Sequence, residues 1–360
     1  MPPGATTAVI RFSSLGDVLL AAHAPSFLRK TAPERRVLFV TKERYAEALR
    51  GHPHIDRFYA LADDSSDPSA PAPLGMRAGL EDLIAAMKLE DVEVLVDLHQ
   101  NFRSSRILNA FPSAKRVLPR KHSLRRRMMV HARWLKPEPL PPLLESYREV
   151  CGLPKDAPLH PWLREALSPR ELTLGKSLLD TEDIPRGVVL LGAGARWETK
   201  RWPARHFVAL GTSIERDLGL AVRYIAAPGE CAVGEIRALL PEARRETLLT
   251  VPFRVLAGLA AHAAVIVSND SAILHLGPAL GIPAVGIFGS TVPGFGFARQ
   301  GSCDEAVEIG LGCRPCDVHG KSRCPLRHHG CMERLLPDIV LAAIERALGK
   351  SIETERAVRT

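Results

Sequence analysis

The sequence lacks any long hydrophobic run. No part of its 360 residues approaches the ~18 consecutive apolar residues that a membrane-spanning helix needs. The N-terminus also lacks the basic start, apolar stretch and cleavage site of a signal peptide. We therefore expect a cytoplasmic protein.

Aromatic residues and glycine-rich loops are scarce as well. Only 5% of the residues are aromatic, and few stand among the basic residues, where a platform for stacking bases would need them. The chain shows no signature of an RNA- or DNA-binding fold. The first candidate loop, Ser13 to Asp17, has Gly16 as its one glycine, which argues against a dinucleotide fingerprint and a nicotinamide cofactor.

The composition is that of a large globular protein. A hydrophobic content of 46% over 360 residues is enough for two cores, and single cores seldom grow past roughly 250 to 300 residues. A net charge of +8 indicates an anionic partner, which composition leaves open between a phosphorylated lipid, a nucleotide sugar and nucleic acid.

Short apolar β-branched runs alternate with helical stretches along the chain. The expected strands are Ala8 to Phe12, Arg36 to Val40, Val92 to Asp97, Val188 to Leu191, Ala221 to Ile225, Ala264 to Ser268 and Ala284 to Phe288. This alternation predicts an α/β protein with two doubly wound parallel sheets. We expect an N-terminal Rossmann-like domain over 1–170, a linker over 171–186, a C-terminal Rossmann-like domain over 187–345 and a tail over 346–360.

Two irregular stretches interrupt the pattern. Asp63 to Pro73 has no buriable pattern and predicts a mobile surface loop. The proline-rich stretch Lys136 to Pro142 precedes the expected domain junction, which we place near residues 165–186.

The segment from Val267 to Pro283 carries the clearest chemical signal. A buried strand stops at Asn269-Asp270 and turns into an expected helix, whose first N–H groups lack internal partners and attract anions such as a diphosphate. Asp270 repels a phosphate unless it caps the helix or binds sugar hydroxyls. An ordinary Asp-capped helix is the alternative interpretation of this segment alone.

Two further segments, Ile10 to Val18 and Gly192 to Pro203, precede this one in an order that resembles the bacterial heptosyltransferases of glycosyltransferase family nine. The resemblance runs from about Val9 to about Leu348. It implies the two-domain GT-B fold, with the domains facing across a cleft. It also implies transfer of heptose, with inversion, from ADP-heptose to the inner core of lipopolysaccharide, whose acceptor is lipid A-Kdo.

The resemblance assigns two catalytic residues. Asp17 matches the general base, which removes a proton from the acceptor hydroxyl. Lys200 matches the lysine that stabilises the departing diphosphate, so that no metal is needed for catalysis. The alternatives are a plain helix-start residue for Asp17 and a solvated surface for Lys200 with Arg201.

The resemblance also assigns the binding residues. The donor-binding set is Gly194, Arg196, Lys200, Glu230, Asp270, Ser271, Ala272, Ile273 and His275. The acceptor-binding set is Ser14, Gly16, Gln100, Arg103, Arg120 and Lys121. Two positions depart from the family pattern, because Ala193 replaces a proline and Ala272 replaces a glycine. A lone histidine such as His275 on an apolar helix is more often a packing residue than a ligand.

The densest basic run is Lys115 to Arg127. Most such runs are only solvated surface. We expect this one to engage an anionic glycolipid, and to hold the enzyme peripherally against the cytoplasmic face of the inner membrane.

Four of the seven cysteines gather in one segment, namely Cys313, Cys316, Cys324 and Cys331. Disulfides are disfavoured in a cytoplasmic chain, whereas four thiolates at short spacing can close a structural metal site. We predict zinc there, with iron as the second choice. His319, His328 and His329 are possible substitutes for a cysteine ligand.

Other functions stay open at this stage. A second enzyme hypothesis is a GT-B glycosyltransferase that uses another nucleotide sugar, or a protein or different glycan as acceptor. A hypothesis of another class is a metal-stabilised protein that binds nucleic acid. The joint presence of Asp17, Lys200 and the Asp270 segment at strand-to-helix junctions favours the enzyme, for which we expect a monomer.

Overall fold

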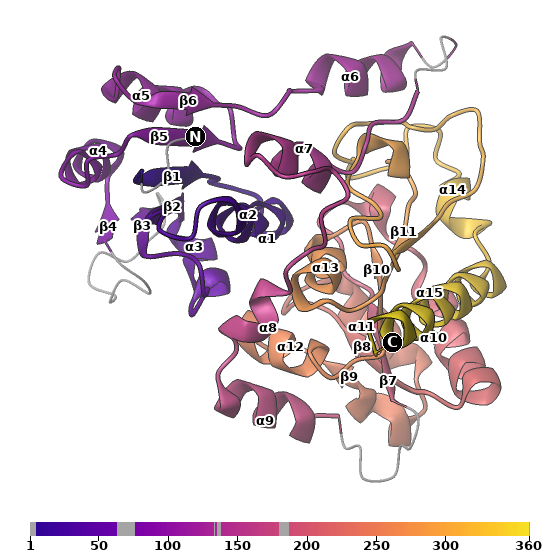
Figure 1. Cartoon of the computed structure of the whole chain (residues 1–360). Coiled ribbons are helices and arrows are strands. Elements are labelled where there is room, and N and C mark those ends of the chain that lie inside the picture. Colours follow the sequence, from indigo (N-terminus) through magenta and orange to yellow (C-terminus); the bar gives the residue numbers. More distant parts are fainter. Residues whose placement is uncertain (1–4, 63–75, 133, 135–137, 180–186, 360) are drawn as a thin grey trace. The chain divides into compact units, whose positions relative to one another are not determined.

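The computed structural model describes residues 5–62, 76–132, 134, 138–179 and 187–359. These residues form two compact units, each with one parallel six-stranded sheet (Figure 1). The expected loop Asp63 to Pro73 lies outside the described residues. None of the helices in the described ranges is both long enough and apolar enough to cross a membrane.

The first unit comprises residues 1–120 and 143–168. Its sheet runs in the order β4 (Met76–Ala78), β3 (Arg57–Leu61), β2 (Val37–Lys42), β1 (Thr7–Ile10), β5 (Val94–Asp97) and β6 (Lys115–Val117). Its helices are α1 (Leu15–Ala21), α2 (His23–Thr31), α3 (Glu43–Ala46), the short η1 (Glu47–Leu49), α4 (Leu80–Lys88), α5 (Phe102–Ala110), α7 (Leu143–Val150) and α8 (Trp162–Ala166).

The second unit comprises residues 121–142 and 169–360. Its sheet runs in the order β12 (Glu305–Val307), β11 (Ala284–Ile287), β10 (Val265–Asn269), β7 (Val188–Gly192), β8 (Ala221–Ile225) and β9 (Leu248–Leu249). Its α-helices are α6 (Ser123–His131), α9 (Pro169–Ser177), α10 (Ala204–Ser213), α11 (Cys231–Leu239), α12 (Phe253–Ala260), α13 (Leu276–Leu280), α14 (Gly330–Glu333) and α15 (Pro337–Arg359). Its 3-10 and π-helical turns are η3 (Glu198–Lys200), η4 (Ile214–Leu218), η5 (Glu242–Thr247), η6 (Ala272–His275) and η7 (Pro293–Phe295).

The expected α/β class with two doubly wound parallel sheets is confirmed. In each sheet the strand order reverses beside the first strand, between β1 and β5 in one unit and between β7 and β10 in the other. Ligands of open α/β sheets bind at such switch points, outside the carboxyl ends of the strands. The loops after these four strands are therefore the first places to look for a site.

The units divide the chain differently from the expected domains. Lys121–Pro142, expected in the N-terminal domain, belongs to the second unit, where Met129 and Val130 of α6 pack against Phe295. Part of the expected linker is helix α9, whose Gly175 packs on the backbone of Gly258. The expected tail continues helix α15 without a break. The physical reason in each case is apolar or close backbone packing that the local composition does not reveal.

A buried histidine stabilises the first unit in its neutral form. The His54 N–H donates to His52 Nδ1 (3.1 Å), which leaves Nε2 to donate to the carbonyl of Ala22 (2.8 Å). The ring stacks on Trp162, with 4.7 Å between ring centroids. Burial lowers the pKa of His52 to about 3, and repulsion from His54 and His160 also lowers it, against the contribution of the Ala22 hydrogen bond.

This histidine predicts that the protein loses stability in mild acid. Below about pH 6.5 the unfolded chain binds a proton on His52 and the folded chain does not. The contribution of His52 to the free energy of unfolding is therefore complete above pH 6.5 and falls as the pH drops toward 3. Between pH 7.5 and pH 5 the free energy of unfolding should fall by about 2 kcal/mol from this group. Urea titrations at both pH values measure the change, and His52→Gln should show a smaller pH dependence. An equal pH dependence in both proteins contradicts the prediction.

Candidate active site

Asp17 lies just beyond the first strand, in the first turn of helix α1. Its Oδ2 atom accepts hydrogen bonds from the backbone N–H (3.0 Å) and the hydroxyl (2.8 Å) of Ser14, the residue that caps the helix. Its Oδ1 atom forms an ion pair with Arg11 Nη2 at 2.8 Å. The Arg11 guanidinium is itself held by the carbonyls of Ser13 and Leu98. The carboxylate is thus fixed from both sides, and its side chain is 20% exposed.

This environment keeps Asp17 ionised. Burial alone would raise the pKa of the carboxyl, but the Arg11 charge and the two hydrogen bonds from Ser14 outweigh it, so the pKa lies below its ordinary value. A carboxylate can accept about four hydrogen bonds. Two of these positions are used on Oδ2 and one on Oδ1, so Oδ1 is the atom left with a position for a further proton donor among the described residues.

Lys200 and Asp270 meet at the switch point of the second sheet. Lys200 ends the turn η3, which follows the β7 loop, and Asp270 directly follows β10. Their Nζ and Oδ2 atoms are 2.6 Å apart, and the side chains are only 14% and 12% exposed. The hydroxyl of Thr291 donates to the same oxygen of Asp270 at 2.6 Å. The positive charge of Lys200 offsets the repulsion that Asp270 would exert on a phosphate.

Asn269 joins the two loops that carry this ion pair. Its side-chain amide donates to the carbonyl of Ala193 (2.8 Å), and its side-chain oxygen accepts from the N–H of Trp202 (3.0 Å). The side chain is completely buried. Because both bonds reach the chain on either side of η3, Asn269 positions Lys200 without contacting it.

Gly194 and Glu230 are also brought together. The Glu230 carboxylate accepts from the N–H of Ala227 (2.8 Å) and lies against Gly194, where an added Cβ would stand 1.9 Å from Oε2. A side chain at position 194 would therefore force the Glu230 carboxylate to move. Arg196 is exposed, with its guanidinium over the Trp197 ring at 5.2 Å from the centroid.

The segment after β10 differs from the expected single helix. A short 3-10 turn, η6, comes first, with Ser271 as its capping residue, and α13 follows. Ser271, Ala272 and Ile273 are half-buried and so within reach of a ligand, whereas His275 is 6% exposed. The burial of His275 places it in the packing of the turn, which is the more common state of such a histidine.

The expected acceptor residues have varied surroundings. Ser14 is exposed and Gly16 is buried in α1. Gln100 has its N–H bonded to Asp97 Oδ1 (2.8 Å), and its side-chain amide donates to the carbonyl of Pro119 (2.7 Å). That amide therefore holds the chain within the basic run, just before Arg120. Arg103 lies exposed on α5.

Arg120 and Lys121 are both exposed but fall in different units, because the division runs between them.

The four-cysteine segment does not form a ready metal site. Cys331 is buried and the other three side chains are half-buried, and none of the four forms a disulfide. Within the described ranges no three His, Cys, Asp or Glu side chains are arranged to hold a metal ion. Cys313 Sγ lies 3.9 Å from His328 Nε2. Burial raises the pKa of the Cys331 thiol to about 11, Arg314 lowers it, and its three neighbouring cysteines add to the rise.

A family model described as glycosyltransferase family 9 (heptosyltransferase) matches residues 81–325, which include the donor-side residues described above. The chain belongs to glycosyltransferase family 9. The Campylobacter jejuni lipooligosaccharide heptosyltransferase 2 (strain 81116) is 26% identical to this family 9 chain over 160 residues, 43% of the chain and 50% of that relative. The chain thus spans about half the length of the curated relatives it matches.

Solved structures resemble the family 9 chain over nearly its whole length. A family 9 glycosyltransferase from Veillonella parvula matches with a TM-score of 0.73 and 18% identity, over 97% of this chain and 99% of that one. The Escherichia coli heptosyltransferase WaaC, solved with ADP, matches with a TM-score of 0.63 and 18% identity, over 95% and 99%. At these identities the likeness establishes the GT-B fold.

One more distant structure bears on the cysteine segment. The dodecameric glycosyltransferase TibC, from enterotoxigenic Escherichia coli, is described as iron-containing and matches with a TM-score of 0.53 and 16% identity, over 98% of this chain and 78% of that one. Structures similar to this chain therefore include a metal-containing glycosyltransferase.

Three residues at the site escaped the sequence interpretation. Arg11 stood inside the first motif, and an arginine directly after a buried strand was a usable signal. Asn269 adjoined Asp270 in the third motif and was noted only as the end of the strand. Thr291 had no local signal, because its partner Asp270 is 21 positions earlier in the chain.

Proposed function

We propose that this protein is an inverting heptosyltransferase that moves a heptosyl unit from ADP-heptose to the inner core of lipopolysaccharide, with lipid A-Kdo as acceptor. Family membership supports the class of reaction. The observation that carries the proposal is the half-buried Lys200–Asp270 pair, held at a sheet switch point where ligands of this class of fold bind.

The second unit would bind the nucleotide-sugar donor. The Lys200 ammonium would stabilise the charge that builds on the diphosphate as it leaves. Gly194 would let the diphosphate approach the backbone, and the carboxylates of Glu230 and Asp270 would accept hydrogen bonds from ribose hydroxyls. The half-buried Ser271, Ala272 and Ile273 would complete the wall, with Arg196 at its rim and His275 as packing behind it.

The first unit would bind the acceptor, together with Lys121 at the start of the second unit. Asp17 Oδ1 would take the proton of the acceptor hydroxyl while that oxygen attacks the anomeric carbon, so the C–O bond to the diphosphate breaks in the same step. Direct displacement leaves no covalent intermediate and inverts the anomeric centre. Ser14 and Gly16 would shape the loop, and Arg103, Arg120 and Lys121 would meet anionic groups of the acceptor, with Gln100 supporting them.

Calorimetry against ADP, UDP, GDP and NAD tests the proposal, with Lys200→Ala beside the unchanged protein. Selective binding of ADP that is lost in Lys200→Ala is the expected result. It would justify assays with ADP-heptose and truncated core acceptors. A preference for UDP or GDP would support a glycosyltransferase whose donor is another nucleotide sugar. No nucleotide binding at all would overturn the proposal and favour the nucleic-acid hypothesis.

We further propose that helix α6 holds the enzyme at an anionic membrane surface. Leu124 is 72% exposed beside the exposed Arg127, and Trp134 just beyond the helix is 79% exposed. Exposed apolar side chains among arginines suit the headgroup region of an anionic bilayer, where each basic residue contributes about 1 kcal/mol. Because Met129 and Val130 are the buried residues of α6, the part of the helix that carries Leu124 and Arg127 lies at the surface.

Flotation with vesicles measures this contact. The protein should float with vesicles that contain phosphatidylglycerol and stay behind with phosphatidylcholine alone. Leu124→Ser with Arg127→Gln should abolish flotation, whereas Arg237→Gln, a change at an exposed arginine of α11, should not. Failure of the unchanged protein to bind anionic vesicles at moderate salt would count against the proposal.

The cysteine segment remains a candidate for a structural metal. Metal binding requires Cys313, Cys316 and Cys324 to close around Cys331, since these thiols do not form a ligand set as they stand. We expect about one equivalent of zinc or iron in protein purified without oxygen. We expect Cys324→Ser to lose the metal and Cys303→Ser to keep it. Well under one equivalent of metal, in protein whose thiols are intact, would contradict this prediction.

A further inference from the structure

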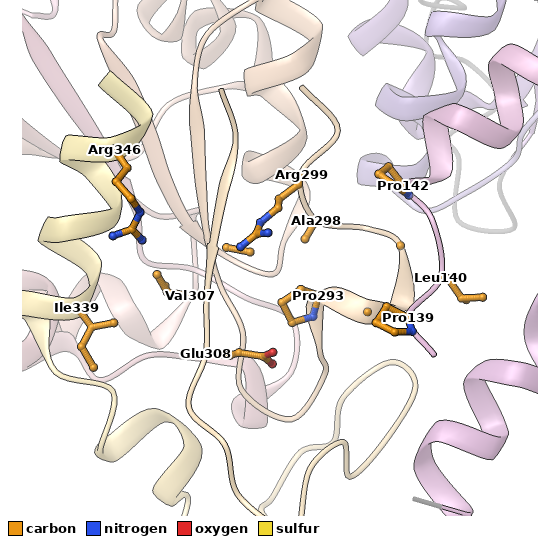
Figure 2. A pocket seen from close by; sticks show the side chains of 13 residues that line it. Pro139, Leu140, Pro142, Pro293, Ala298, Arg299, Val307, Glu308, Ile339 and Arg346 are labelled. Carbon is orange, nitrogen blue, oxygen red and sulfur yellow. The ribbon is translucent and has the colours of Figure 1, made fainter. Parts of the chain in front are cut away.

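A cavity of about 500 Å³ opens on the second unit, apart from the Lys200–Asp270 pair. Figure 2 shows Arg346 and Ile339 on the helix α15 side, Pro139 and Pro293 on the other side, and Arg299 between them. Its volume is in the range of sites for small organic ligands. None of the roles proposed above uses these residues.

One wall of the cavity is apolar and well fixed. Pro139, Leu140 and Pro142 form it together with Pro293. The Leu140 N–H donates to the carbonyl of Gly294 (2.8 Å), which ties the two segments together. A Cβ at Gly296 would stand 2.6 Å from the carbonyl oxygen of Pro141, so this turn has no room for a side chain. The wall is therefore built from packed backbone and prolines, and does not depend on flexible side chains.

The opposite side carries excess positive charge. The carboxylate that lines the cavity there, Glu308, pairs with Arg314 at 2.8 Å. Glu305, which precedes the lining residue Ala306 in the chain, pairs with Lys350 at 2.5 Å. Arg346 lies 3.6 Å from Glu305 and is 53% exposed. Arg299 is exposed, and Glu305, which attracts it, is already paired with Lys350. Arg299 and Arg346 thus retain most of their capacity to donate to an anion.

We propose that this cavity binds a small amphipathic anion, a molecule with an apolar body and a carboxylate, phosphate or sulfonate group. The apolar body would lie on the proline wall and against Ile339, which is 42% exposed. The anionic group would accept hydrogen bonds from Arg299 and Arg346. This inference does not rest on the proposed heptosyl transfer.

The fluorescent probe 8-anilinonaphthalene-1-sulfonate tests the site, because it combines both parts. Arg299 has a φ of +49°, so Arg299→Gly removes the guanidinium and at the same time suits the backbone. We expect Arg299→Gly and Arg346→Gln each to weaken probe binding about tenfold, the loss of one charged hydrogen bond. Arg237→Gln, at an exposed arginine elsewhere on the same unit, should leave binding unchanged.

Competition separates this cavity from the donor site. Octanoate should displace the probe, whereas octan-1-ol and inorganic phosphate at the same concentration should not, because each lacks one half of the ligand. Saturating ADP should leave the probe bound, and Lys200→Ala should bind it normally. Displacement by ADP, or unchanged binding in the Arg299→Gly, Arg346→Gln double variant, would overturn the proposal.

Discussion

Replacing Asp17 by asparagine should lower the turnover of heptosyl transfer by about 100- to 10,000-fold, the usual contribution of a positioned general base. Asparagine keeps the size of the side chain but cannot take the proton at Oδ1. The affinity for ADP should not change, because Asp17 and the donor residues belong to different units. Turnover is measured as ADP release in the presence of a truncated core acceptor.

The matched control for this change is Asp217→Asn, at an exposed carboxylate that pairs with its neighbour Arg216. It should transfer normally. Circular dichroism and an ADP titration establish that Asp17→Asn is folded. If folded Asp17→Asn turns over at a rate near that of the unchanged protein, Asp17 is not the base.

The pH profile adds a second test of the same residue. Because Arg11 and Ser14 hold the pKa of Asp17 below its ordinary value, kcat/KM of the unchanged enzyme should show no acidic limb above about pH 4. Arg11→Gln removes the positive charge that lowers the pKa of Asp17, while the burial that raises this pKa remains. The pKa of Asp17 therefore rises, and the acidic limb moves to higher pH. Arg11→Lys should restore most of the original profile. Superimposable profiles for all three proteins would show that Arg11 does not control the base.

Replacing Lys200 by alanine should have the second large effect. Loss of a preorganised cation at a departing group typically costs about 100- to 1,000-fold in turnover. The affinity for ADP should also fall, because the diphosphate loses its closest positive charge and faces the unshielded carboxylate of Asp270. Calorimetry with ADP and the ADP-release assay measure the two losses separately.

The variant Asp270→Asn distinguishes a direct role of Lys200 on the diphosphate from a purely structural role of the ion pair. This variant breaks the same ion pair from the other side, with its 2.6 Å contact, but leaves the ammonium in place. If Lys200 acts directly on the diphosphate, Asp270→Asn should lose much less ADP affinity than Lys200→Ala, because it weakens only the contacts of residue 270 with ribose hydroxyls and keeps the cation. Equal losses in the two variants would mean that the pair only holds the loops together. Lys176→Ala, at an exposed lysine of α9, is the control.

The sequence predicted the central strands because they are fully buried on both faces. The expected runs at Ala8, Val188 and Ala284 coincide with β1, β7 and β11 to within one or two residues at each end. The additional strands β3, β4, β6, β9 and β12 were not predicted. Four of them have only two or three residues, and β3 begins with an exposed arginine. Because β6 carries exposed basic residues, it is strand pairing with β5, and not hydrophobic pattern, that makes it a strand.

The same distinction applies to the site. The three motifs could be located from the sequence because each follows a buried strand, and a parallel sheet brings all such ends to one edge. That Lys200 would be paired with Asp270, or that Arg11 would hold Asp17, could not be predicted from spacing. Those contacts depend on where each loop turns after its strand.

What the sequence alone determined is the class of fold, the family and the loops that carry the chemistry, since hydrophobic period and motif order are local properties of the chain. Tertiary structure decided the rest. It buried His275, left the four thiols without a common centre, joined α6 to the second unit and opened the cavity beside Arg299. Each of these depends on contacts between residues far apart in the chain, and their energies are not encoded in any one segment.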